Sequence, residues 1–289
     1  MRMKTPLELI NLSGLMKRTR GSREVVIGLI DGPIQRSHPD LAHAVIREIP
    51  GELSGACARA TSAACMHGTF VAGVLCARRE SAAPAICPAC TLLLRPIFAE
   101  STSEDPSTPS ATPKELATAV INCVDGGARV INLSAALARP SPNTDRELQD
   151  VLDHAARRGV IVVAAAGNQG AIGSSAITRH PWVIPVVACD LTGGPLAESN
   201  LASSIGRRGL SAPGKNITSL AADHKTATAG GTSVAAAFVT GAIALLLSEF
   251  PGVTAGRVRT AMSPNVAPRR AALVPPLLDA WAAYQSLAG

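Results

Sequence analysis

Short runs of consecutive apolar residues alternate along the chain with longer segments of helical periodicity. The apolar runs predict buried strands near 25–30, 91–97, 128–133, 160–165 and 183–189. The periodic segments predict helices near 67–78, 113–126, 144–158 and 232–249. Because buried strands alternate with helices, the pattern predicts an α/β fold of three layers, a mostly parallel sheet with helices on both faces.

One apolar segment is long enough to cross a bilayer. Residues 226–248 contain no charged side chain. The first third is rich in glycine, threonine and serine, and a helix through the centre of a large α/β domain is apolar all round. We therefore expect a buried core helix and no membrane partner.

Three short islands supply the groups of a serine-nucleophile triad. They are IDGPIQRSHPDL around Asp31, HGTFVAGVL around His67 and GGTSVAAAFVTGA around Ser233. A serine is a poor nucleophile unless an adjacent imidazole takes its proton, and that imidazole needs a carboxylate to fix its tautomer. We therefore predict Ser233 as nucleophile, His67 as base and Asp31 as the carboxylate.

The neighbouring residues predict where each side chain lies. Asp31 follows the apolar run VVIGLI, so it is expected at the carboxyl end of a strand, where open α/β sheets place their sites. HGT and GGTS each look like a turn that opens into an apolar helix, which predicts both His67 and Ser233 at helix N-termini. The run VIVVAAAGNQG predicts another buried strand that ends at Asn168, a candidate oxyanion-hole donor.

In their order and neighbours these islands resemble the subtilisin-like serine proteases, over roughly residues 25 to 250. The resemblance implies the three-layer subtilisin-like fold, hydrolysis of peptide bonds through an acyl-enzyme, and an oxyanion hole at Asn168. It also implies substrate-binding segments on both sides of the first specificity pocket: Ser134, Ala135, Ala136, Ala165, Ala166 and Gly167.

Within that family the chain looks most like the proteases that mature cyanobactins and similar ribosomally made peptides. The phrases RPIF, VIPVVACD, SNLASSIGRRGLSAPG and ITSLAAD carry this closer likeness. It implies a specific processing enzyme that removes a leader or follower from a precursor peptide. Ring-closing members carry a helical insertion near the site. Asp31 and His67 are only 36 positions apart in the chain, which leaves little room for such an insertion. Hydrolysis is therefore expected.

Some residues depart from the family pattern. Gly32 stands where serine or threonine is usual, Phe70 replaces a second histidine, and Ala135-Ala136 replace a commoner Leu-Gly. None of these changes removes a triad atom. The alternatives to a processing protease are a catalytically silent or partner-gated peptide-binding homologue, and an activator protease for a toxin or defence effector.

Composition narrows the class of protein. With 289 residues and 47% apolar content, the chain supports one large core. We expect an N-terminal extension (1–24), a catalytic domain (25–250) and C-terminal helices packed on the same domain (251–289). Aromatic residues make up 2% of the chain, and the basic residues behind the net charge of +6 are scattered pairs, so a nucleic-acid partner is not expected. The start lacks the apolar segment of a secretory signal, which predicts a cytoplasmic protein.

The chain has seven cysteines, an odd number. Most of them, among them Cys123 and Cys189, are expected to be reduced. Cys87 and Cys90 could join Cys57 and Cys65 in a zinc site, but one or two local disulfides near His67 are the alternative.

No cofactor is expected. The calcium sites of secreted subtilases need clustered oxygen ligands, and here only three neighbouring acidic residues come close to such a cluster, so calcium is not predicted. They are Glu100, Glu104 and Asp105.

Overall fold

The computed structural model describes residues 4–100, 111–134, 142–263 and 272–289. Its centre is a seven-stranded sheet in the order β2-β3-β1-β4-β5-β6-β7, with every neighbouring pair parallel. The strands are β1 (Val26–Asp31), β2 (Val45–Glu48), β3 (Thr91–Pro96), β4 (Val130–Leu133), β5 (Ile161–Ala165), β6 (Val183–Cys189) and β7 (Leu210–Pro213). The predicted α/β class and parallel sheet are confirmed.

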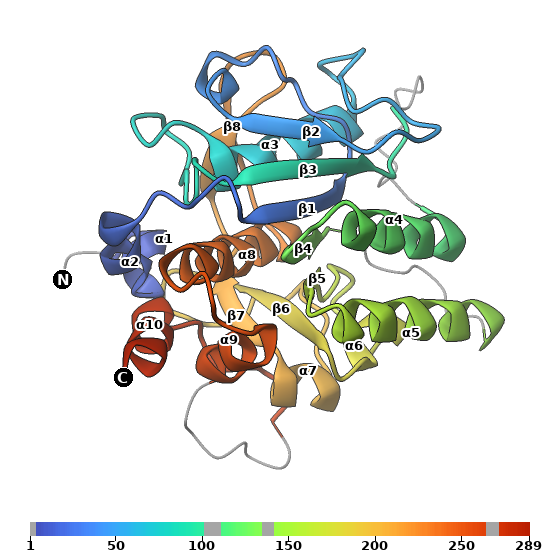
Figure 1. Ribbon diagram of the computed structural model, residues 1–289, viewed down its shortest axis with the longest axis vertical. Coiled ribbons are helices and arrows are strands. Elements are labelled where there is room, and N and C mark those ends of the chain that lie inside the picture. Colours follow the sequence, from blue (N-terminus) through green and yellow to red (C-terminus); the bar gives the residue numbers. More distant parts are fainter. Residues whose placement is uncertain (1–3, 101–110, 135–141, 264–271) are drawn as a thin grey trace.

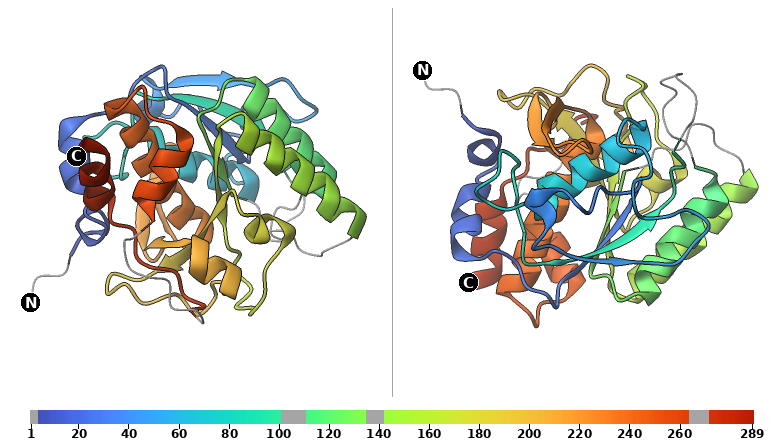
Figure 2. Two further views of the ribbon diagram at one scale, coloured as in Figure 1. Left: turned by 60° about the horizontal axis from the view of Figure 1, so that its bottom comes forward. Right: turned by 90° about the horizontal axis from the view of Figure 1, so that it is seen from above.

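Helices cover both faces of this sheet (Figures 1 and 2). On one face α3 (Ala63–Cys76) and α8 (Thr232–Glu249) pack against each other around the fully buried Phe238. On the other face α4 (Pro113–Asp125) and α5 (Pro142–Arg157) form a second apolar core. The remaining elements are short: α1 (Pro6–Leu9), α2 (Leu12–Arg18), the 3-10 turn Pro39–Leu41, α6 (Ala176–Arg179), α7 (Ser203–Arg208), β8 (Ile217–Leu220), β9 (Thr226–Ala229), α9 (Ala255–Met262) and α10 (Ala280–Ala288).

Helix α2 near the N-terminus and helix α10 near the C-terminus lie side by side, as Figure 1 shows. The amide of Ala280 donates to the carbonyl of Ile10 (3.0 Å), and the side chain of Asn11 donates to that of Asp279 (3.0 Å). Just before α10, the backbone around Leu277 pairs with Ser211 on the outer edge of β7. The C-terminal segment therefore covers an edge strand that would otherwise expose unpaired backbone groups.

Helix α8 is the long apolar segment noted in the sequence. By length and composition it could cross a membrane. However, 89% of the helix is buried inside the protein, against β4, β5, β6 and β7. The two-stranded antiparallel hairpin β8–β9 leads directly into its N-terminus. The helix thus carries its first residues to the carboxyl edge of the sheet.

Helix α3 begins earlier than the sequence predicted. Ser62 caps it, its hydroxyl accepting a hydrogen bond from the amide of Cys65, so His67 lies in the second turn and not at the N-terminus. The prediction went wrong because Gly68 reads as a turn residue. Gly68 is instead needed for close packing, since a Cβ there would lie only 2.5 Å from the carbonyl oxygen of Gly32.

Replacing Gly68 by alanine should therefore destabilise the protein. The added methyl group would push α3 away from the loop after β1, and such overpacking costs about 1–3 kcal/mol, or roughly 2–12 °C in Tm for a chain of this size. Calorimetry would measure this. The matched control is Gly256→Ala, a helical glycine in α9 with open space around it, which should be neutral or stabilising. An unchanged Tm for Gly68→Ala would contradict the close-packing argument.

Candidate active site

The acid and base of the predicted triad lie in direct contact. Asp31 ends β1 with its side chain fully buried, and its Oδ1 lies 2.7 Å from Nδ1 of His67. A carboxylate only accepts hydrogen bonds, so Nδ1 carries the proton and Nε2 keeps the lone pair of a base. The His67 side chain is 35% exposed, which leaves the ring open to substrate.

The same contact tunes the basicity of His67. Burial by itself lowers the pKa of the imidazole, but the charge of Asp31 and its hydrogen bond together raise it above the ordinary value of 6.5. A histidine with a raised pKa accepts a proton more readily. The arrangement therefore suits a general base that later becomes a general acid.

The unusual residue Gly32 has a steric explanation. Its amide donates to Oδ1 of Asp31 (2.6 Å), whereas Oδ2 of Asp31 is buried without a hydrogen-bond partner among the described residues. A hydroxyl side chain at position 32 could contact this carboxylate, but a Cβ there would lie 2.6 Å from the carbonyl carbon of Ala64. The close approach of α3 to this loop therefore requires glycine.

Ser233 lies in the first turn of α8, as the sequence predicted, and is 8% exposed. Its hydroxyl donates to the carbonyl of Ser134 (3.2 Å) and makes no hydrogen bond to His67 among the described residues. The amide of Ser134 in turn donates to the carbonyl of Ile30, the neighbour of Asp31 (3.3 Å). The proposed nucleophile and acid are thus connected through the ends of β4 and β1. The hydrogen bond from Ser233 to His67 is of a kind that commonly forms or tightens only when substrate binds.

A buried polar chain holds this part of β4. Asn132 is fully buried, donates from its side chain to the hydroxyl of Ser134 (3.0 Å), and accepts from the hydroxyl of Thr240 on α8 (2.8 Å). Such a fully satisfied network fixes its members in one arrangement. Asn132 and Thr240 were not singled out from the sequence, where a lone polar residue in an apolar segment was the available signal.

Asn168 follows β5 and is held by the residue before the nucleophile. Its Oδ1 accepts from the amide (2.9 Å) and the hydroxyl (3.0 Å) of Thr232. Among the described residues the Nδ2 of Asn168 has no hydrogen-bond partner, and it lies beside Gly231, whose φ is 111° and whose missing side chain leaves space there. An oxyanion hole needs such an unpaired donor, and the amide of Ser233 in the first turn of α8 could add a second one.

Thr232 is a positioning residue that sequence reasoning missed. It is fully buried, and its hydroxyl also accepts from the amide of Gly167 (3.2 Å). The side chain thus ties the end of β5 to the start of α8. Its place directly before Ser233 in GGTS was the only signal.

Thr232→Val should slow catalysis without weakening substrate binding. Valine keeps the shape and the backbone amide that donates to Asn168, but it loses the hydroxyl that also donates to Asn168 and accepts from Gly167. We therefore expect kcat to fall about tenfold to a hundredfold with KM nearly unchanged. Steady-state kinetics on a peptide substrate would measure the split. Thr232→Ser, which keeps the hydroxyl, is the control and should retain most of the activity; equal losses in both variants would count against the positioning role.

The predicted substrate-binding segments fall partly inside the described structure. Ser134, Ala165, Ala166 and Gly167 lie at the carboxyl ends of the neighbouring strands β4 and β5. Ser134 accepts a hydrogen bond from the hydroxyl of Ser233, and the amide of Gly167 donates to Thr232, so both strand ends contact the first turn of α8. Ala135 and Ala136 lie outside the described residues.

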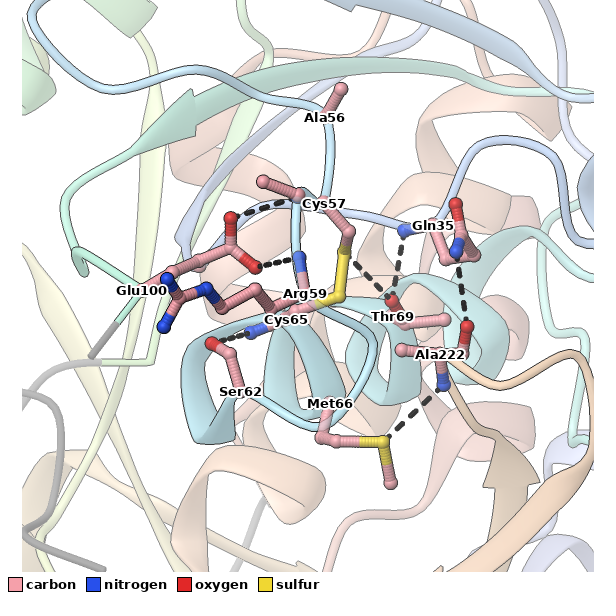
Figure 3. Close-up of a disulfide and its surroundings, with 12 residues drawn as sticks. Gln35, Ala56, Cys57, Arg59, Ser62, Cys65, Met66, Thr69, Glu100 and Ala222 are labelled. Atoms are coloured by element: carbon pink, nitrogen blue, oxygen red, sulfur yellow. Dashed lines mark hydrogen bonds between the residues drawn. A yellow bond between two sulfur atoms is a disulfide. The ribbon is translucent and has the colours of Figure 1, made fainter. Parts of the chain in front are cut away.

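The four cysteines considered for zinc do not come together. Cys57 and Cys65 form a disulfide, whereas Cys87 and Cys90 are free and buried elsewhere, so the four-cysteine zinc site is wrong and the alternative of a local disulfide holds for one pair (Figure 3). Cys123 and Cys189 are free and buried, as expected.

Of the three acidic residues weighed for calcium, only Glu100 is described. Its carboxylate accepts from the amides of Ala58 (2.8 Å) and Arg59 (2.9 Å). In the described parts of the chain, it forms with Cys57 and Cys65 the one cluster that could hold a metal ion, but the two sulfurs are bonded to each other. Glu104 and Asp105 lie outside the described residues.

Solved structures of related proteins share the whole fold. The protease domain of PatA superposes with a TM-score of 0.81 at 29% identity, covering 93% of this chain and 97% of that one. The prenylagaramide maturation protease PagA gives a TM-score of 0.82 at 27% identity, covering 96% and 99%. The PatG macrocyclase domain, at 21% identity and a TM-score of 0.80, shares the fold.

Sequence comparisons point the same way. Subtilisin DY from Bacillus licheniformis is 31% identical over 245 residues, which cover 83% of this chain and 82% of that protein. Subtilisin amylosacchariticus from Bacillus subtilis subsp. amylosacchariticus is 31% identical over 241 residues, covering 81% of this chain and 58% of that longer protein. A family model described as the subtilase family matches residues 22–274. The resemblance seen in the sequence is confirmed, and the chain belongs to the subtilase family of serine endopeptidases.

Proposed function

We propose that this protein is a processing protease that cuts a precursor peptide at a leader or follower boundary, through a triad of Asp31, His67 and Ser233. The observation that carries the chemistry is the 2.7 Å contact between Asp31 and His67 at the sheet edge that also holds Ser233. The likeness to PatA and PagA, both named as maturation proteases, supports the class of substrate.

The proposed reaction begins with acylation. Oγ of Ser233 attacks the carbonyl carbon of the scissile bond while Nε2 of His67 takes the hydroxyl proton. The oxyanion that forms accepts hydrogen bonds from the side-chain amide of Asn168 and the backbone amide of Ser233. His67 then gives its proton to the leaving amine, the carbon–nitrogen bond breaks, and an ester to Ser233 remains.

Deacylation repeats these steps with water. His67 takes a proton from water as its oxygen attacks the ester carbonyl, and returns a proton to Oγ of Ser233 as the carboxylic acid leaves. The product of this route is a linear peptide. A second peptide amine in place of water would instead give transpeptidation, which the same triad permits.

Narrow specificity and a cytoplasmic location belong to the same proposal. A protease that works among cellular proteins must discriminate strongly between substrates. Five free, buried cysteines are consistent with a reducing compartment, whereas a disulfide is more common outside it.

The experiment is cleavage profiling on two kinds of substrate. The purified protein is incubated with a proteome-derived peptide library and with full-length ribosomal precursor peptides encoded beside its gene, with Ser233→Ala as the control. We expect one junction to be cut in a precursor and few library peptides to be cut, with linear products in the mass spectrum. Broad library cleavage would indicate a degradative enzyme, cyclic products would indicate transpeptidation, and no cleavage of any precursor would count against the proposed substrate class.

A further inference from the structure

A disulfide lies immediately in front of the catalytic histidine. It joins Cys57, in the loop before α3, to Cys65 in the first turn of that helix, with Cα atoms 5.6 Å apart. Cys65 is fully buried and Cys57 is half-buried. Figure 3 shows the two sulfurs between Glu100 and Thr69.

On its Cys57 side, the cross-link is attached to the segment that follows Asp31. The amide of Ile34 donates to the carbonyl of Gly55 (2.9 Å), and the amide of Cys57 donates back to the carbonyl of Ile34 (3.4 Å). Glu100, just beyond β3, holds the same loop by the two backbone amides named above. Cys57 is therefore fixed to the loop that leaves the acid of the triad.

On its Cys65 side, the cross-link is attached to the base. Cys65 precedes His67 by two residues in α3. Thr69, in the same turn as His67, accepts a hydrogen bond from the amide of Gln35 (2.9 Å) and contacts the sulfur of Cys57 (3.9 Å). The disulfide thus spans the two segments between which the Asp31–His67 contact is made. It covalently cross-links these segments next to that contact.

This pair is the one disulfide among the described cysteines, and one of its two residues is partly exposed. Cys76, Cys87, Cys90, Cys123 and Cys189 are all buried and free. Burial raises the pKa of Cys123 and of Cys189 to about 12, which keeps them as unreactive thiols. Cys57 is half-buried, and Cys65 as a leaving thiolate would lie in the first turn of a helix, where the backbone amides favour negative charge.

We propose that Cys57 and Cys65 form a thiol-exchange site through which a dithiol reductant loosens the Asp31–His67 contact and lowers the activity of the enzyme. This inference rests on the proposed function of the triad. A thiolate of the reductant attacks Sγ of Cys57, the S–S bond breaks, and Cys65 leaves as a thiolate and takes up a proton. The second thiol of the reductant then displaces Cys57, so that the protein gains two thiols and the reductant becomes a disulfide.

The test compares the oxidised and the reduced protein with a fluorophosphonate probe, which labels an activated serine without any peptide substrate. After treatment with dithiothreitol, checked by intact mass, we expect the rate of labelling at Ser233 to fall about tenfold, because small displacements of a base are costly. Oxidised dithiothreitol should restore the rate. The variant Cys57→Ser/Cys65→Ser should label at the slow rate in both buffers, and Cys123→Ala, as the matched control, should keep the full redox response.

Two further readouts separate this inference from a general loss of structure and from failure of the proposed function. Reduction should move the acid limb of the labelling rate to lower pH, because His67 loses part of the contact that raises its pKa, and should speed hydrogen exchange at the first two turns of α3. Equal labelling rates and equal exchange in both states would overturn the inference. Absence of labelling in both states would argue against the triad chemistry, and the exchange rates would then decide the structural role of the disulfide by themselves.

Discussion

Ser233→Ala should abolish both hydrolysis and labelling by a fluorophosphonate. The hydroxyl of Ser233 lies in the first turn of α8 and donates to the carbonyl of Ser134, and Asn168 is bonded to the preceding residue, Thr232. Ser233 is therefore the hydroxyl that we expect to attack the substrate carbonyl. We expect kcat to fall by about 10⁶, the scale on which loss of a triad nucleophile acts. Intact mass after exposure to the probe and product release from a peptide would be measured together.

A matched control for this substitution is Ser248→Ala. Ser248 lies near the other end of the same helix, where its hydroxyl donates to the carbonyl of Ala244 and contacts the sulfur of Cys90. This variant should label at one site like the parent. Labelling that persists in Ser233→Ala would show that another nucleophile reacts and would contradict the assignment of Ser233.

Asp31→Asn should lower kcat/KM by about 10⁴ while leaving the fold in place. An amide at position 31 can present an N–H to Nδ1 of His67, which moves the imidazole proton to Nε2 and removes the base. The side chain is fully buried and almost isosteric, so substrate binding should change little. Stopped-flow and steady-state kinetics on a peptide substrate would measure the loss of kcat/KM.

The pH dependence of activity should change in a defined direction in this variant. In the parent enzyme the charge of Asp31 raises the pKa of His67 above 6.5, so activity should fall as the pH drops through that raised value and His67 becomes protonated. In Asp31→Asn only the lowering effect of burial remains, and the acid limb of the residual activity should move to lower pH. A limb that stays in place would mean that another group controls it.

The sequence by itself was sufficient for the fold class and for the choice of candidate catalytic residues, because both depend on local patterns. Apolar runs such as VVIGLI and VIVVAAAG form buried parallel strands, and polar residues directly after them must emerge at the carboxyl edge of the sheet. Asp31, Asn168 and Ser233 were therefore placed correctly. The family likeness added the substrate-binding segments, whose role stays a prediction; of these residues Ser134, Ala165, Ala166 and Gly167 lie at the ends of β4 and β5.

What depends on contacts between distant segments could not be taken from the sequence. The start of α3 was misplaced because Gly68 reads as a helix breaker, and only the packed structure shows that its missing side chain admits the carbonyl of Gly32. The pairing of Cys57 with Cys65 was one of several that seven cysteines allow, and it was decided by the short distance between the loop of Cys57 and the first turn of α3. Thr232 became a positioning residue only once β5 and α8 met and its hydroxyl found Asn168. The sequence thus determined which groups are the candidates for the chemistry. The tertiary structure decided which neighbours hold them, because hydrogen bonds and close contacts are made in space between residues far apart in the chain.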